Sequence, residues 1–184
     1  MVDGKMIWPF NDNKNMNIPE DGTEGGFLED RKDRFHCGVD IYAPRGEPIL
    51  SIEDGKVLDV SVFTSPERVS YWNNTVQILF KADSGIFYRY AELEESLVEK
   101  GKQIHEGDTI GYVGQVLNPN VINKESPEYI QRLAKKNKLS MLHLETYTKH
   151  PTDSRFYLGG NWFGKQIPNS LISPHIVLRR IQEK

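Results

Sequence analysis

Short apolar or alternating runs, separated by turn residues, constrain the fold of this 184-residue chain more than any other feature. The turn signals include Gly46-Glu47-Pro48, Asp54-Gly55, Asp83-Ser84-Gly85 and Glu106-Gly107-Asp108. The runs between them cover residues 48–52, 56–63, 75–80, 86–90, 109–116 and 141–147. Many short strands at such spacing predict an all-β fold, mainly an antiparallel β-sandwich or barrel-like structure.

One segment predicts a helix near residues 126–136, inserted among the strands. Ser126 offers an N-cap, Pro127 suits the first helical position, and Glu128 places an acid in the first turn. The residues that follow on one face are Tyr129, Ile130, Leu133 and Ala134. Asn137 is expected to end this helix, which lies within a longer predicted insertion at residues 118–139.

The composition indicates a single domain over residues 1–184. Hydrophobic residues make up 38% and charged residues 27%, which is ordinary for a folded protein. A chain of this size can bury roughly 70% of its unfolded surface. Residues 1–34 are polar and rich in turn residues, so we expect a loop-rich lead-in over the surface or, alternatively, a mobile arm.

Charge and cysteine usage exclude several classes of function. The formal net charge of −3 provides no general electrostatic footprint for a nucleic-acid partner. No apolar run approaches the ~20 residues of a membrane span. The single cysteine, Cys37, excludes an internal disulfide and a multi-cysteine zinc motif. The first ten residues, MVDGKMIWPF, lack the regions of a secretory signal, which leaves an internal location or a mature or truncated chain as interpretations.

His36 and Asp40 lie four positions apart in the stretch RFHCGVDIYAPRG. On a straight strand their side chains would stand ~13 Å apart, too far for one ion to be bound by both at about 2 Å. Gly38 lies midway between them and tolerates unusual backbone angles. A turn or bulge at this glycine would therefore bring His36 back towards Asp40.

A third candidate ligand, His143, lies in the alternating run SMLHLETY. Side chains of a strand repeat with period two, so Leu142 and Leu144 share one face while Met141, His143 and Glu145 share the other. His36, Asp40 and His143 would together form a three-ligand site of the catalytic zinc type, with the fourth position left for water. Spacing alone leaves an ordinary structural histidine as the alternative.

The stretch RFHCGVDIYAPRGEPILSIEDGKV resembles the signature of the lysostaphin/LytM-type zinc metallopeptidases, which are bacterial cell-wall endopeptidases. The shared pattern is His-x-Gly-x-Asp-Ile, then Ala-Pro-x-Gly-x-Pro, then Asp-Gly-x-Val. The likeness continues through YWNNTVQILF, FYRYAELEESLVEKGKQIHEGDTIGYVG and LHLETY. The resemblance implies a compact β fold of the duplicated hybrid motif type and Zn²⁺ held by His36, Asp40 and His143. It also implies peptidoglycan peptides as substrates, and a secreted or cell-envelope location.

Two departures from the family pattern concern catalysis. The family has histidines that polarise the zinc-bound water in a Tyr-x-His-Leu phrase and at the first position of His-x-His. Here these positions are Glu92 and Met141. Met141 cannot transfer a proton, whereas Glu92 could act as the general base or become a fourth ligand that closes the site. The insertion at 118–139 replaces the family's short glycine-rich loop, where it could cover one wall of the groove.

Three functional hypotheses follow from these residues. The first is a zinc metallopeptidase acting on cell-wall peptides, with Glu92 as the base. The second is a metal-binding relative without catalysis that recognises peptides or a protein partner. The third, a biotinyl or lipoyl carrier domain or a related sugar-phosphotransfer module, is suggested by hairpins such as GKQIHEGDTIGYVG. It ranks last because no exposed Met-Lys-Met-type turn is present and such a domain does not need the His/Asp/His set.

Several other side chains are expected to be ordinary structural or surface residues. The side chain of Cys37 is expected to point away from the bend, and His105 is expected to face solvent. His150 and His175 are assigned to loops of the C-terminal part. Arg34 and Arg45 flank the ligand motif, where they are either surface charges or contacts to a substrate carboxylate.

Overall fold

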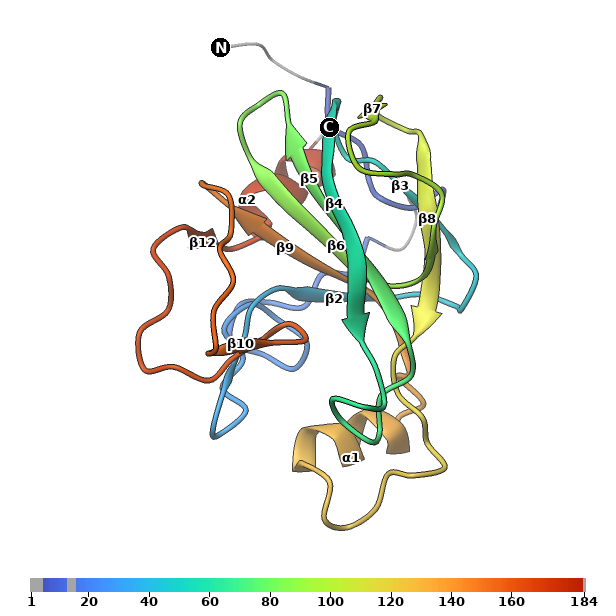
Figure 1. The fold of residues 1–184 in the computed structure, drawn as a ribbon, viewed down its shortest axis with the longest axis vertical. Coiled ribbons are helices and arrows are strands. Elements are labelled where there is room, and N and C mark those ends of the chain that lie inside the picture. Colours follow the sequence, from blue (N-terminus) through green and yellow to red (C-terminus); the bar gives the residue numbers. More distant parts are fainter. Residues whose placement is uncertain (1–4, 13–15, 184) are drawn as a thin grey trace.

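The computed structural model describes residues 5–12 and 16–183, so residues 1–4 and 13–15 of the predicted lead-in lie outside the described ranges. The described chain folds mainly into antiparallel β-strands with two short helices (Figure 1). The strands are β1 (Phe35–His36), β2 (Val39–Tyr42), β3 (Pro48–Leu50), β4 (Gly55–Thr64), β5 (Thr75–Ala82), β6 (Phe87–Ser96), β7 (Gln103–Ile104), β8 (Thr109–Gln115), β9 (Ser140–Tyr147), β10 (Tyr157–Leu158), β11 (Asn161–Trp162) and β12 (Leu171–Ile172). The helices are α1 (Glu128–Lys135) and α2 (His175–Gln182).

Two antiparallel sheets organise the described strands. The larger sheet runs in the order β12-β9-β8-β6-β5-β4-β7, with β2 paired to β9 and β3 paired to β8. The smaller sheet has the order β1-β11-β10. The larger sheet curls so that β4, β5 and β6 lie in front of β2 and β9 in the view of Figure 1. The all-β, mainly antiparallel fold predicted from the turn spacing is confirmed.

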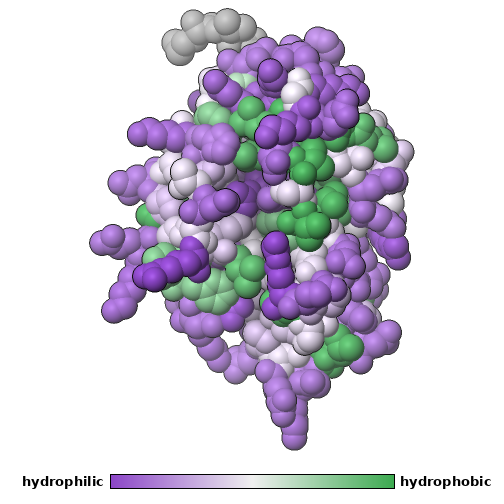
Figure 2. All heavy atoms as spheres, viewed as in Figure 1, coloured by the Kyte–Doolittle hydropathy of each residue, from purple (hydrophilic) through white to green (hydrophobic). Residues whose placement is uncertain are grey.

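The main core lies inside this curled sheet. The inward face of β9 contributes Leu142 and Leu144, both fully buried, as the alternation of that strand predicts. Trp8 and Phe10 of the lead-in join the same core. This part of the lead-in is therefore anchored by apolar burial and is not a free arm. On the face drawn in Figure 2, hydrophobic side chains lie towards the middle, and hydrophilic ones project around the rim.

Helix α1 agrees with the helix predicted near residues 126–136. Asn137 follows it with a φ of 55°, a left-handed conformation that ends a helix. The backbone N–H of Lys138 donates to the carbonyl of Leu133, and so satisfies one carbonyl at this end. The start of the helix differs from the prediction, because Pro127, expected at the first helical position, is the N-cap in place of Ser126, and no side chain caps the helix.

Helix α2 is a second helix that the sequence interpretation missed. It begins after Ser173-Pro174 and buries Val177, Leu178 and Ile181 against the main core. His175, expected in a loop, is instead the first residue of this helix and is buried, with Nδ1 2.8 Å from Oδ1 of Asp21. In Figure 1, α1 and α2 lie at different ends of the molecule. Neither these helices nor any other among the described residues is long and apolar enough to cross a membrane.

Candidate metal site

His36, Asp40 and His143 meet in one buried cluster. His36 Nε2 lies 3.1 Å from His143 Nδ1 and 3.1 Å from Asp40 Oδ1, and His143 Nδ1 lies 2.9 Å from Asp40 Oδ1. Donor atoms bound to one zinc at 2.0–2.2 Å in a tetrahedron stand about 3.3 Å apart. The three atoms are thus nearly at the spacing of ligands around one small ion, and two imidazoles with a carboxylate are a donor set that suits zinc.

Strand pairing and a bend place these three side chains. Asp40 of β2 lies directly opposite His143 of β9 in the antiparallel ladder. His36 belongs to the other sheet, where it pairs with Asn161 of β11. The chain bends between β1 and β2, at the position where a turn was expected.

The bend requires a glycine at position 38, but for a different reason from the predicted tolerance of unusual backbone angles. Gly38 does not adopt a positive φ, so unusual backbone angles are not what requires a glycine. A Cβ atom at this position would lie 2.3 Å from the carbonyl oxygen of Leu144. The absence of a side chain therefore allows the bend to pack tightly against β9, which brings His36 over His143.

Each imidazole is oriented by a hydrogen bond on the nitrogen that faces away from the cluster. His36 Nδ1 lies 2.8 Å from the carbonyl oxygen of Gly26, and His143 Nε2 lies 2.9 Å from Glu145 Oε1. Such partners fix the tautomer and ring orientation of a metal-binding histidine. They leave His36 Nε2 and His143 Nδ1 free to act as ligand atoms.

Glu145 is in turn held by several groups. Tyr157 donates a hydrogen bond to Oε1 at 2.7 Å, and Tyr147 donates one to Oε2. Arg89 Nε lies 3.3 Å from Oε2. Although burial alone raises the pKa of Glu145, the charge of Arg89 and the hydrogen bond with His143 lower it to about 2. Glu145 is therefore a carboxylate anchored behind the cluster.

Asp40 and His143 stabilise each other's charged forms. Burial opposes ionisation of Asp40, but the contacts with His36 and His143 hold its pKa well below the ordinary value. Burial alone would lower the pKa of His143, yet its hydrogen bonds with Asp40 and Glu145 raise it to about 10. A protonated His143 donates one N–H to Asp40 and the other to Glu145.

Arg31 reaches the cluster from the lead-in segment. Its guanidinium lies 3.5 Å from Asp40 Oδ2 and donates a 3.0 Å hydrogen bond to Asn161 Oδ1. It also pairs with Glu29 at 2.9 Å and lies 4.4 Å from the ring centroid of Tyr129. Arg31 thus pairs with Oδ2 of Asp40, and Oδ1 of Asp40 remains available to the ligand cluster.

Glu92 lines the same cavity as the three candidate ligands. Its φ is 65°, a strained value for a residue other than glycine. Its Oε2 is buried without a hydrogen-bond partner among the described residues. Burial, followed by the negative charge of Asp40, raises the pKa of Glu92 to about 8. A buried, unpartnered carboxyl at such a place is typical of a functional site.

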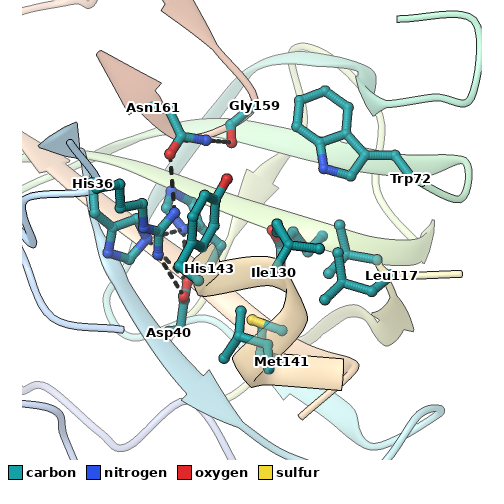
Figure 3. A pocket seen from close by; sticks show the side chains of 14 residues that line it. His36, Asp40, Trp72, Leu117, Ile130, Met141, His143, Gly159 and Asn161 are labelled. Carbon is teal, nitrogen blue, oxygen red and sulfur yellow. Dashed lines mark hydrogen bonds and ion pairs between the residues drawn. The ribbon is translucent and has the colours of Figure 1, made fainter. Parts of the chain in front are cut away.

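Met141 belongs to the apolar wall of the cavity. Only 2% of it is exposed, and it packs in a cluster with Trp72, Leu117, Ile130 and others. Figure 3 shows these four side chains on one side of the cavity, with His36, Asp40, His143 and Asn161 on the other. Met141 therefore acts here as a packing residue.

Helix α1 covers the cluster. Its residues Tyr129, Ile130 and Leu133 line the cavity that holds the candidate ligands, and this cavity measures about 30 Å³. His36, Asp40 and His143 are only 1%, 4% and 1% exposed. The described conformation has room for an ion or a water at this place, but no room for a peptide.

The other residues singled out in the sequence lie away from the cluster. Cys37 is buried among Phe27, Tyr147 and Leu171, and burial raises the pKa of its thiol well above the ordinary value. Arg34 pairs with Asp33, and Arg45 pairs with Glu94. The side chain of His105 is 75% exposed, as expected, and His150 is exposed as well.

The antiparallel fold thus carries a buried His/Asp/His cluster whose atoms could hold one metal ion. Residues 34–127 match the model of peptidase family M23, and the chain belongs to this family. This result confirms the resemblance identified from the sequence. No curated protein matches the chain significantly.

Solved structures share the fold. Lysostaphin from Staphylococcus simulans aligns with a TM-score of 0.54 and 15% identity over 91% of this chain and 51% of its own. A putative glycyl-glycine endopeptidase lytM from Ruminococcus gnavus aligns with a TM-score of 0.51 and 23% identity, over 95% of this chain and 62% of its own. A putative peptidase M23 from Pseudomonas aeruginosa aligns with a TM-score of 0.50 and 14% identity over 95% and 50% of the two chains. The chain therefore spans about half to two thirds of the length of these proteins.

Proposed function

We propose that this chain is a single zinc-dependent peptidase domain that hydrolyses peptide bonds of cell-wall peptidoglycan outside the cytoplasm. His36, Asp40 and His143 are the proposed ligands. The observation that carries the proposal is the spacing of their ligand atoms, 2.9 to 3.1 Å from one another in a buried cluster. Membership of peptidase family M23 supports a peptide substrate.

The donor set fits zinc in its chemistry as well as its spacing. When bound, zinc would polarise the scissile carbonyl and lower the pKa of a bound water. For His143 to bind a metal it must give up the proton at Nδ1, while its Nε2–H continues to donate a hydrogen bond to Glu145. The hydrogen bond from His36 to the Gly26 carbonyl has the same orienting role for the second imidazole.

Glu92 is the proposed general base. It lines the ligand cavity, and its buried Oε2 is free to accept a proton from a water molecule. A base works best when its pKa is near the working pH, and burial, followed by the charge of Asp40, raises the pKa of Glu92 from its ordinary value of 4.5 towards this range. Met141 offers no such function, so Glu92 is the side chain proposed to replace the family's histidines.

A peptide can reach these residues only if α1 moves. Tyr129, Ile130 and Leu133 occupy the space in front of the ligands, and the remaining cavity of about 30 Å³ is much smaller than a peptide. The proposed reaction therefore includes displacement of the 118–139 insertion before substrate binds.

The position of α1 in front of the ligands also favours a second candidate function, a metal-binding domain without catalysis. In that case α1 stays closed, Glu92 acts as a fourth ligand, and the metal stabilises a fold that recognises peptides or a protein partner. The apolar packing of Met141 at the position of a family histidine agrees with this candidate.

Hydrolysis assays separate the two candidates. Zinc-loaded protein would be incubated with peptidoglycan and with glycine- and alanine-rich peptides, together with Glu92→Gln and the control Glu95→Gln, which changes an exposed glutamate of the same strand. Cleavage that falls at least ~100-fold in Glu92→Gln but not in the control supports the peptidase. Inert wild-type protein, with Glu92→Gln changing only zinc affinity, supports the second candidate.

A further inference from the structure

A groove of about 640 Å³ lies beside the metal site and is not covered by α1. Its walls come from β4, β5, Arg68 of the segment between them, Arg89 of β6, and residues 152–155 and 157–159. Gly159 lines both this groove and the ligand cavity. Phe63, also in the groove wall, stacks on His143 with ring centroids 5.6 Å apart. The groove is therefore directly adjacent to the proposed reaction centre.

The charge of this groove differs from that of the whole chain. It is lined by three arginines, Arg68, Arg89 and Arg155, and by one acid, Asp153, although the chain carries a net charge of −3. Arg89 is paired with Glu145. Arg68 and Arg155 are exposed, and neither forms an ion pair with a described residue. Two cations are therefore available to a ligand in the groove.

Other contacts hold these two arginines near the groove without neutralising them. Arg68 donates a 3.3 Å hydrogen bond to the carbonyl of Phe63, and the Arg155 guanidinium lies 4.9 Å from the ring centroid of Phe156. Both contacts leave guanidinium N–H groups unused, because a guanidinium carries five donors.

Gln77 adds an unused polar group in the same wall. Its Nε2 donates a 3.0 Å hydrogen bond to Ser61 Oγ, whereas its Oε1 is buried without a partner among the described residues. Buried polar atoms of folded proteins normally have a hydrogen-bond partner. This oxygen is too buried for a ligand to reach in the described conformation, so recognition in the groove rests on its arginines.

We propose that this groove binds a carboxylate of the peptide substrate beside the scissile bond, with Arg68 and Arg155 as the specificity-determining residues. The inference rests on the proposed peptidase function, because it assigns the substrate class of that site. Planar guanidinium groups bind carboxylates through paired hydrogen bonds. The carboxylate is that of an acidic side chain or of a free C-terminus, which share this chemistry.

The test measures binding, so it does not depend on hydrolysis. Fluorescently labelled Gly-Gly-Glu-Ala-Gly with an amidated C-terminus is compared with its Gln analogue and with the Gln peptide bearing a free C-terminus, using the full zinc-treated chain. The wild type is expected to bind one carboxylate peptide about three- to tenfold more tightly than the neutral peptide. The peptide that gains affinity identifies the source of the carboxylate.

Two variants and a control assign the preference to the groove. Arg68→Gln and Arg155→Gln change exposed side chains, so both are expected to fold, and each should reduce the preference; the double variant should reduce it below about twofold. Arg179→Gln, which removes the same charge from an exposed site on α2, should leave it unchanged. Equal binding of all three peptides by the wild type, or equal losses in Arg179→Gln and the groove variants, overturns the proposal. A carboxylate preference without any hydrolysis supports the groove and counts only against the peptidase.

Discussion

The Nε2 atom of His143 lies 2.9 Å from Oε1 of Glu145, a residue two positions further along the same strand. Because strand side chains repeat with period two, both point to the same face of β9. The other ring nitrogen of His143 is then directed at Asp40 and His36. One short stretch of strand thus provides both a candidate ligand and the carboxylate that orients it.

Glu145→Gln is expected to weaken zinc binding by about 10- to 100-fold, because an amide orients and polarises an imidazole less well than a carboxylate. Zinc affinity would be measured by competition with a chromogenic chelator, beside Glu95→Gln as an exposed control. Circular dichroism would verify that the variant is folded. An unchanged affinity in folded Glu145→Gln would contradict the orienting role.

Gly160→Ala is expected to distort the site. A Cβ at this position would lie 2.6 Å from His143 Cε1, and the φ of Gly160 is 76°. Gly22→Ala is a matched control, because Gly22 has a φ of 78° and no atom within 4 Å of an added Cβ. Both should lose about 1 kcal/mol of stability through the backbone, but only Gly160→Ala should also lose zinc affinity. Equal zinc affinities in the two variants would argue against the close packing on His143.

Met141 should behave as a packing residue. Met141→Ala is expected to destabilise the fold by about 2–5 kcal/mol, because it leaves a cavity in the apolar wall. Met141→Leu should cost less than about 1.5 kcal/mol and should retain zinc affinity and any hydrolytic rate. Urea denaturation and the peptide assay would measure these effects. A loss of hydrolysis in stable Met141→Leu would show instead that the thioether takes part in the reaction.

Glu24 is expected to make the attachment of α1 dependent on pH. Its carboxylate lies 2.8 Å from Lys136 Nζ and 3.4 Å from Arg132 Nε. The hydrogen bond with Lys136 lowers the pKa of Glu24 below its ordinary value of 4.5. A lowered pKa in the folded state means that the stabilisation is complete above about 4.5 and is lost as the pH falls through the lower, folded value.

The thermal stabilities of wild type and Glu24→Gln should therefore differ at pH 7 and converge in acid. The expected difference is about 0.5 kcal/mol, because these side chains are partly exposed, and salt should reduce it. Glu99→Gln, at an exposed glutamate away from this cluster, should show no such difference. A difference that persists unchanged to pH 3 would exclude Glu24 ionisation as its cause.

Local patterns predicted α1, the strands β3, β4, β5, β8 and β9, and the first half of β6, because period-two alternation, turn residues and a Ser-Pro-Glu start act over a few residues. The strands β1, β2, β7, β10, β11 and β12 were not predicted, because two to four residues are too few to show a period. The proximity of His36, Asp40 and His143 could also be predicted from the sequence, because it needs only a bend at Gly38 and one strand pairing. Glu145 could have been identified from its position on the same strand face as His143. The Ser173-Pro174 pair before α2 is a start signal of the same kind as Ser126-Pro127.

Other parts of the site depend on packing between distant segments. Arg31 reaches Asn161 across 130 positions of sequence, and it does so from a loop without periodicity. The insertion was expected to reshape or cover one wall of the groove, but the sequence could not predict that Tyr129, Ile130 and Leu133 close over the ligands. That closure results from packing of the apolar face of α1 against Trp72, Leu117 and Met141.

The central claim is that His36, Asp40 and His143 bind one zinc ion. The most direct measurement is the metal content of the purified chain after zinc loading and dialysis, determined by elemental analysis for the wild type, His36→Ala, His143→Ala and the exposed control His105→Ala. About one zinc per chain in the wild type and the control, with little in the two ligand variants, is the predicted result. A folded wild-type protein that retains no zinc would contradict the account.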